Sequence, residues 1–283
     1  MIAVLGGLVA AFAFGISTLA YSRATRLLAP AVVLAWVMLL GAVIVVPGIL
    51  LFGLPVTFTP ESLFWLALVG IGNVGGLLLT FTALRSAQVG IVATIVSTEG
   101  AIAAVFAVIA GEPLPVAVAI ALAVIVAGVV LTTLVPGEVG SLEAPSSRRA
   151  AILAAGAAVL FGLGLYATGR VGDGVPVIWV LLPARLIGVF AVALPLVLSH
   201  RLTLPSAAAP LVVVAAIAEV VGFASFAIGA REAVAISAVL VSQFATVSLV
   251  LAYVLFGERI SRRQLAGIVL VMVGVAAVTV LRV

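Results

Sequence analysis

Two stretches decide the fold of this chain: GEPLPVAVAIALAVIVAGVVL at 111–131 and GERISRRQLAGIVLVMVGVAAV at 257–278. Each opens on a Gly-Glu pair, and each carries a Gly-Val pair at the same distance further along. A shift of 146 residues therefore aligns both landmarks at once. Near the start of each half, a shift of 147 places Phe14-Gly15 on Phe161-Gly162. The repetition predicts that the chain is an internal duplication.

The composition is that of a membrane protein. Hydrophobic residues make up 66% of the chain and charged residues 8%, with a mean hydropathy of +1.51. A soluble domain has about 25% charged residues, so this chain lacks the polar residues to cover a surface in water. The absence of cysteine excludes disulfides and thiolate chemistry. All the cationic residues are arginines, and we assign them to lipid headgroups and membrane orientation rather than to nucleic acid.

Apolar stretches of about 20 residues, the length that spans a bilayer, recur along the chain. We predict an all-α integral membrane protein with ten transmembrane helices at about 2–22, 31–53, 62–84, 88–110, 115–135, 151–169, 175–198, 207–230, 233–256 and 262–281. The first of these has no basic flank, and we expect it to be retained rather than cleaved.

The polar stretch PGEVGSLEAPSSRRA at 136–150 interrupts the chain at its midpoint. We predict a first five-helix repeat at 1–135, a linker loop at 136–150 and a second five-helix repeat at 151–283. Because five is odd, the second repeat must enter the membrane upside down. Two inverted five-helix repeats are typical of secondary transporters, which bind substrate near the midplane between the halves.

Two helix starts carry recognisable caps. Thr59-Pro60-Glu61 offers an N-cap residue, a proline at the first helical position and an early acid. Ser261 and Gln264 have the spacing of a capping box before the last helix.

With these landmarks the chain resembles the drug/metabolite transporter superfamily, specifically its ten-helix EamA-type family. The paired Gly-Glu turns, each followed by a glycine-containing last helix, carry most of the resemblance. Arg185, in LLPARLIGVF, resembles the Ala-Leu-Arg of the family, whereas the matching Ala35-Trp36 in the first half lacks the arginine. The resemblance implies export or exchange of small metabolites, often coupled to protons, by alternating access.

Strongly polar residues lie near the centres of four predicted helices: Asn73, Glu99, Glu219 and Gln243. The 146-residue shift places Asn73 on Glu219, and it places Ser97, two residues from Glu99, on Gln243. Polar side chains at this depth cost free energy unless they find partners or water, and they usually face the bundle interior. We therefore expect them to converge on one central cavity, although Asn73 and Gln243 also suit hydrogen bonds between helices.

Three charged residues are the candidates for proton coupling or substrate binding. Glu219 and Glu99 are carboxyl groups that can be protonated in one state and charged in another. Arg185 is the only cation near mid-membrane and could neutralise either glutamate or bind a substrate carboxylate. The alternative is a structural Arg–Glu pair that only holds helices together.

Further residues are candidates for lining the cavity: Ser17, Ser97, Tyr21, Tyr166, Trp36 and Trp179. For the aromatic residues the alternative is an interfacial belt at the membrane surface, where Trp and Tyr are enriched.

Two other signals are set aside. GIGNVG at 70–75 matches the dinucleotide-binding pattern, but it lies inside an apolar helix instead of between a strand and a helix. We interpret Gly72 and Gly76 as residues that allow close helix packing. His200 is the only histidine, and with no second ligand beside it we expect no metal site.

The arginines also predict an orientation. Loops after odd-numbered helices carry nine of them, and loops after even-numbered helices, with the tails, carry three. By the positive-inside rule, the odd loops are cytoplasmic and both termini lie outside. Ten-helix relatives are generally taken to have cytoplasmic termini, so both orientations stay open at this stage.

The pattern as a whole predicts a secondary transporter of the bacterial cytoplasmic (inner) membrane. We expect it to move small metabolites or drugs, such as amino acids or amines, by alternating access, with export as the direction and proton coupling as an option. Its partners would be small-molecule substrate and membrane lipid, and its oligomeric state a monomer or weak homodimer. We expect no catalytic residue, cofactor or nucleic acid. The alternatives are a flippase for lipid-linked substrates and an integral-membrane enzyme.

Overall fold

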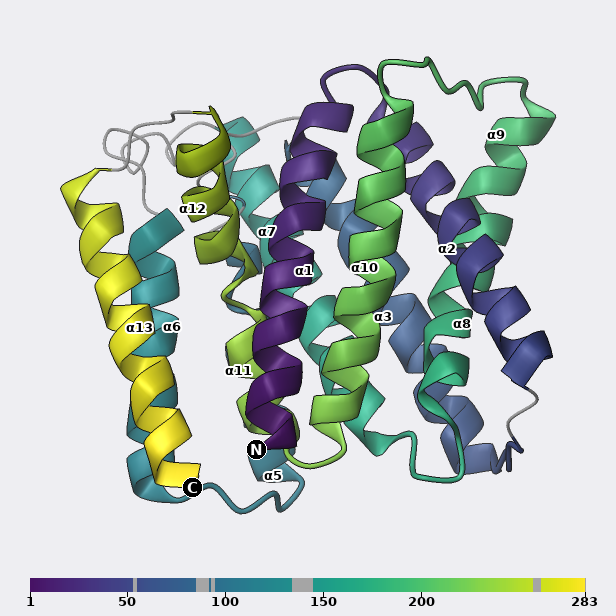
Figure 1. The fold of residues 1–283 in the computed structure, drawn as a ribbon. Helices are drawn as coiled ribbons and strands as arrows, with labels where there is room; N and C mark the ends of the chain where they lie inside the picture. The colour runs from purple at the N-terminus through teal and green to yellow at the C-terminus, as the bar shows by residue number, and fades with distance from the viewer. Residues whose placement is uncertain (53–54, 85–91, 93–94, 134–144, 257–260, 283) are drawn as a thin grey trace.

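The computed structural model describes residues 1–52, 55–84, 92, 95–133, 145–256 and 261–282, and its regular structure is entirely helical. The helices, numbered as in Figure 1, are α1 (Ile2–Ala24), α2 (Pro30–Phe52), α3 (Pro60–Leu84), α5 (Glu99–Ile109), α6 (Val116–Thr133), α7 (Pro145–Arg170), α8 (Val177–Gly188), the π-helix η2 (Val189–Ala193), α9 (Leu194–Leu198), α10 (Ala209–Ala230), α11 (Val234–Val241), α12 (Phe244–Phe256) and α13 (Arg262–Arg282).

Seven helices of the described part are long and apolar enough to cross a membrane, and two shorter apolar helices accompany them. The chain is therefore a multi-pass, all-helical membrane protein. α8, η2 and α9 follow one another without interruption, and α11 and α12 are separated only by a turn at Ser242-Gln243. α7 begins at Pro145, earlier than the predicted 151. Of the linker predicted at 136–150, residues 145–150 belong to α7, and residues 136–144 lie outside the described residues, as do the start of the helix predicted at 88 and the Gly257-Glu258 turn.

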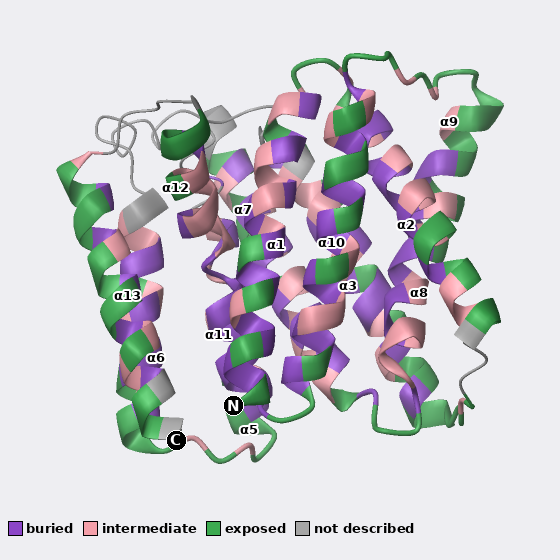
Figure 2. Cartoon of the chain, in the orientation of Figure 1, coloured by how far each residue is buried: buried purple, intermediate pink, exposed green. Residues whose placement is uncertain are grey.

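Figure 1 shows the helices as a bundle of upright columns, with the N-terminal end of α1 and the C-terminal end of α13 at the same face. We call this the terminal face. Figure 2 shows the buried residues on the inner sides of the columns, and every residue of α11 is buried. α11 is thus the most enclosed helix of the bundle.

Glycines set the close contacts between helices. A Cβ added to Gly72 of α3 would lie 2.5 Å from the carbonyl oxygen of Leu160 in α7. A Cβ added to Gly6 of α1 would lie 2.6 Å from the carbonyl oxygen of Ser225 in α10. In lipid, where no hydrophobic effect drives helices together, such backbone approach supplies the van der Waals contact that holds them. The interpretation of Gly72 as a packing residue is confirmed.

The contact between α6 and α13 is built twice by equivalent residues. A Cβ on Gly128 would meet the backbone of Gly267 and Val271 within 2.8 Å, and a Cβ on Gly274 would meet Ala121 and Ile125. The 146-residue shift carries Gly128 onto Gly274. It also carries Ala121 and Ile125 onto Gly267 and Val271.

Both predicted caps at helix starts are present. Ser261 and Gln264 form a reciprocal capping box, with the backbone N–H of Ser261 donating to Oε1 of Gln264 at 2.9 Å. Thr59 caps α3, but its reciprocal partner is the Ser62 hydroxyl. Glu61 instead accepts a hydrogen bond from the indole of Trp65.

Two helices end in the left-handed turn known as a Schellman motif. Gly111, with φ of 93°, follows α5, and the N–H of Glu112 donates back to the carbonyl of Ala107. His200, with φ of 52°, plays the same part after α9, and Arg201 donates to Leu196. The only histidine therefore ends a helix.

The close contact at Gly72 gives a stability prediction. We expect Gly72→Ala to lower the unfolding free energy by about 1–3 kcal/mol, because the new methyl must push α3 and α7 apart. Gly75→Ala is the matched control, since its Cβ would approach only the flexible tip of Leu160, at 3.0 Å. Thermal unfolding of both variants in detergent checks this, and equal stability of the two would contradict the packing account.

Candidate functional site

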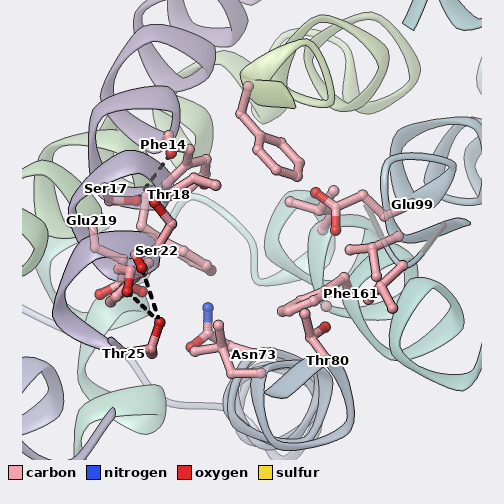
Figure 3. Close-up of a pocket in the computed structure, with 18 of the residues that line it drawn as sticks. Phe14, Ser17, Thr18, Ser22, Thr25, Asn73, Thr80, Glu99, Phe161 and Glu219 are labelled. Carbon is pink, nitrogen blue, oxygen red and sulfur yellow. Dashed lines mark hydrogen bonds between the residues drawn. The ribbon is translucent and has the colours of Figure 1, made fainter. Parts of the chain in front are cut away.

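A cavity of about 220 Å³ lies inside the bundle. Its wall is built by residues of α1, α3, α7 and α10, together with Val92, Val96, Glu99 and Phe244. Figure 3 shows two walls facing one another, with Ser17, Ser22 and Glu219 on one side and Glu99 and Phe161 on the other. The polar residues of the wall are Ser17, Thr18, Tyr21, Ser22, Thr25, Asn73, Thr80, Glu99 and Glu219.

The cavity reaches toward the face opposite the termini. Its wall on α1 runs from Phe14 to Thr25, which lies just beyond the C-terminal end of that helix. The other half of α1 is packed tightly: a Cβ on Gly6 would collide with α10, and one on Gly7 would lie 3.0 Å from the carbonyl oxygen of Ser237 in α11. The bundle is therefore hollow toward one face and filled toward the other.

Two glutamates, Glu112 and Glu232, link helices at the closely packed terminal face. The Glu112 carboxylate accepts hydrogen bonds of 3.1 Å from the backbone N–H groups of Val234 and Ala235, at the start of α11. The Glu232 carboxylate accepts a bond from the N–H of Ala3 and pairs with the N-terminal ammonium of Met1 at 2.9 Å. A carboxylate at a helix N-terminus satisfies otherwise unpaired N–H groups and is attracted by the helix dipole. Each link joins a segment of the first half to one of the second.

Arg185 pairs with Glu219. The two side chains form a buried ion pair and hydrogen bond between α8 and α10, and Arg185 is 1% exposed. Gly41 of α2 leaves room for the guanidinium, because a Cβ there would lie 2.8 Å from its Nε. Of the two partners the sequence allowed for Arg185, the structure selects Glu219. Two polar atoms of the pair, Oε1 of Glu219 and Nε of Arg185, have no hydrogen-bond partner among the described residues.

Glu99 has no such partner. Its side chain is 7% exposed, and no described residue forms a hydrogen bond or ion pair with its carboxyl group. It is the first residue of α5, where the helix dipole favours an anion by about 0.3–1 kcal/mol. Insertion of an ionised side chain at mid-membrane costs about 2.5–3.5 kcal/mol. The dipole offsets only part of this cost, so the described residues leave an ionised Glu99 largely uncompensated.

The position of Glu99 depends on a break in its helix. Ile95 and Val96 are helical, Ser97 and Thr98 form a turn, and α5 then begins. The second half has the corresponding turn at Ser242-Gln243, between α11 and α12. Ser97 and Gln243, aligned by the 146-residue shift, are both buried at these breaks and lie outside the cavity wall. Discontinuous helices that meet at mid-depth are the usual carriers of binding sites in transporters.

Three hydroxyl groups of the wall donate to backbone carbonyls of α1. Ser17 donates to the carbonyl of Phe14 at 3.1 Å, Ser22 to Leu19 at 2.9 Å and Thr25 to Tyr21 at 2.9 Å. Each of these hydroxyl oxygens therefore faces the cavity mainly as an acceptor. The Asn73 amide oxygen and the Thr80 hydroxyl have no hydrogen-bond partner among the described residues.

Most of the aromatic residues predicted for the cavity lie elsewhere. Tyr21 is in the wall. Tyr166 instead packs edge-on against Trp65, with ring centroids 5.7 Å apart, and Trp179 packs edge-on against Phe58 at 5.4 Å. The indole of Trp36 donates to the carbonyl of Thr203 at 3.1 Å.

Besides Tyr21, the aromatic residues that line the cavity are four phenylalanines that sequence reasoning missed as site residues: Phe14, Phe161, Phe223 and Phe244. The signal was present, because Phe14 and Phe161 are aligned by the repeat. Their contacts are equivalent too. A Cβ on Gly222 would meet the Phe14 ring, and a Cβ on Gly76 would meet the Phe161 ring.

The buried ion pair gives a second stability prediction. Glu219→Gln leaves Arg185 as an uncompensated buried charge and should cost about 3–5 kcal/mol of stability. The double variant Arg185→Met, Glu219→Gln removes both charges and should recover most of that loss. Chemical or thermal unfolding in detergent measures both. A double variant no more stable than Glu219→Gln would show that the unpaired charge of Arg185 does not cause the loss of stability.

A multi-pass helical bundle with a largely apolar cavity, which carries a few polar side chains and is closed toward one face, is the architecture of a membrane protein that handles a small molecule. The model of the EamA-like transporter family matches residues 1–134 and again 148–280. The chain therefore belongs to the EamA-like transporter family, whose members are membrane transporters of small molecules rather than enzymes.

Structural comparison agrees on the fold. A solved crystal structure with 24% sequence identity superposes with a TM-score of 0.81, covering 99% of this chain and 96% of the other. No curated protein matches the chain.

Proposed function

We propose that the protein is a secondary transporter that exports small molecules across the bacterial inner membrane in exchange for protons carried by Glu99. The observation behind this proposal is the charge balance in the bundle. Arg185 and Glu219 neutralise each other, whereas Glu99 faces the cavity as a carboxyl group with no partner among the described residues.

The proposed architecture is ten membrane helices in two inverted five-helix repeats, 1–135 and 151–283, joined by a linker at 136–150. Three pairs of equivalent features support it. Gly128 and Gly274 make matching contacts, Phe14 and Phe161 meet matching glycines, and the helix breaks fall at Ser97 and Gln243. An inverted pair of repeats can exchange conformations, so that each face of the membrane is opened in turn.

Alternating access is supported by the unequal packing of the two faces. The terminal face is filled by glycine contacts and held by Glu112 and Glu232, whereas the cavity reaches Thr25 near the opposite face. From the two orientations left open above, we propose the one that the arginine distribution favours, with that opposite face in the cytoplasm. In this state substrate would enter from the cytoplasm, which is the direction of an exporter.

Proton exchange follows from the cost of an unpaired anion. When the cavity holds no ligand, a proton on Glu99 removes the charge, and substrate binding replaces the proton. Arg185 and Glu219 stay paired throughout and position α8 against α10. A membrane enzyme would need a catalytic cluster near the headgroups, and the residues gathered at this cavity do not form one. A flippase for lipid-linked substrates would be a variant of the same transport architecture.

Glu99→Gln tests the function. Wild-type protein in liposomes with a trapped pH dye should move protons when given a substrate from a panel of amino acids, amines, nucleosides and drugs. We expect Glu99→Gln to abolish this proton movement, because the amide cannot ionise. Glu61→Gln is the control, since Glu61 lies exposed near the start of α3 and bonds only to Trp65. Proton movement that persists in Glu99→Gln would overturn the proposed role.

Glu112→Gln tests the closed face. Loss of the charged cap on α11 should raise the population opened toward the termini about 2- to 30-fold, the equivalent of about 0.5–2 kcal/mol. Because the chain has no cysteine, Ser237→Cys would introduce a single thiol, at a position that is fully buried in this state. A membrane-impermeant maleimide should label that thiol faster when Glu112→Gln is added. An unchanged labelling rate would show that Glu112 does not hold the face shut.

A further inference from the structure

We infer that the substrate is a small organic monocation, an ammonium group on an apolar, preferably aromatic, body. This inference rests on the proposed function, since it names the chemical class that the same cavity accepts. It is carried by the charges, the hydrogen-bonding groups, the rings and the size of the cavity.

The charges favour a cation. Among the described residues of the wall, Glu99 and Glu219 are acidic, and none is Arg, Lys or His. Glu219 is already paired with Arg185, which lies buried behind it against Met38 and Gly41. A bound carboxylate would thus find no free cation among the described residues of the wall, and it would oppose ionisation of Glu99. An ammonium group would neutralise the charge of an ionised Glu99.

The hydrogen-bonding groups favour a donor. Ser17, Ser22 and Thr25 use their protons on helix carbonyls, so their oxygens are left to accept. The Glu99 carboxylate is an acceptor when ionised, whereas Asn73 turns its amide nitrogen, a donor, toward the space between the walls (Figure 3), and the Thr80 hydroxyl can donate or accept. The acceptors of the wall are therefore the hydroxyls of Ser17, Ser22 and Thr25 and the Glu99 carboxylate. An alkylammonium has up to three N–H donors and no acceptor, which complements this wall.

The rings favour an apolar body next to that ammonium. Phe14 and Phe223 pack edge-on with centroids 6.5 Å apart, and Phe161 and Phe244 complete the aromatic part of the wall. Ring faces attract a desolvated cation and provide van der Waals contact for an aromatic or aliphatic group. The cavity is therefore polar where it must balance one charge and apolar elsewhere.

The size favours a small molecule. About 220 Å³ lies below the roughly 300–1,000 Å³ of pockets that enclose drug-sized ligands. A cavity of this volume can enclose an amine with a single ring, whereas a lipid-linked headgroup is too large for it.

One free carboxylate also fixes the electrical balance of transport. Glu99 carries one proton on one leg of the cycle and one monocation on the other. Both loaded forms have the same charge, so exchange is electroneutral. Transport of a monocation should then follow the proton gradient and should not respond to an imposed membrane potential.

The experiment compares four probes that share a phenyl ring: phenethylamine, phenylalanine, 3-phenylpropionate and 2-phenylethanol. Calorimetry on the full chain in detergent would measure Kd for wild type, Glu99→Gln and the control Glu61→Gln. We expect phenethylamine to bind wild type and Glu61→Gln about 10- to 100-fold more tightly than Glu99→Gln, as for one charge-assisted hydrogen bond. The zwitterion, the anion and the neutral alcohol should bind more weakly than the amine.

The outcomes separate the two proposals. If phenylalanine binds wild type as tightly as phenethylamine, or if the amine binds Glu99→Gln equally well, the monocation assignment is overturned. If another class in the liposome panel moves protons through Glu99, the proposed function stands and only the substrate class fails. If no probe binds and no compound moves protons, both fail. Amine transport that changes with a potassium diffusion potential would overturn the electroneutral cycle.

Discussion

The structure depends on how charge is held in a medium that does not tolerate it. Among the described residues, three charged side chains lie deep in the bundle, and the charges of two of them, Arg185 and Glu219, neutralise each other. A buried pair of this kind is expensive to break and contributes little net stability, so it serves mainly to fix α8 and α10 in place. The third, Glu99, is left at the start of α5 with only the helix dipole to favour its charge. The cavity is therefore left with one carboxyl group that has no countercharge among the described residues.

Close packing elsewhere makes the cavity one-sided. Glycines let α1 meet α10 and α3 meet α7 at backbone distance, and the caps from Glu112 and Glu232 hold the terminal face. Toward the other end the same helices present phenylalanines and hydroxyls around open space. The contacts that fill one face are made by small residues and single carboxylates. A bundle built in this way is suited to opening one face as it closes the other.

Local rules predicted much of the fold. Apolar length located the helices, the capping box at Ser261 is present, and Gly72 packs as expected. The helix breaks were marked only indirectly, by polar Ser97 and Gln243 at equivalent positions. Spacing did not reveal which glutamate Arg185 would choose, because that depends on how α8 and α10 cross. Phe14 and Phe161 were visible as repeat landmarks, yet their role in the wall follows from the tertiary arrangement, as does the placement of Tyr166, Trp36 and Trp179 outside it.

The central claim is that one carboxyl group exchanges a proton for a cation, and proton release on binding tests it most directly. Phenethylamine would be added as the ammonium salt to the detergent-solubilised protein in weak buffer containing a pH indicator. The account predicts release of up to one proton per bound amine from wild type, and none from Glu99→Gln. Binding without proton release in wild type, or equal release from both proteins, would contradict it.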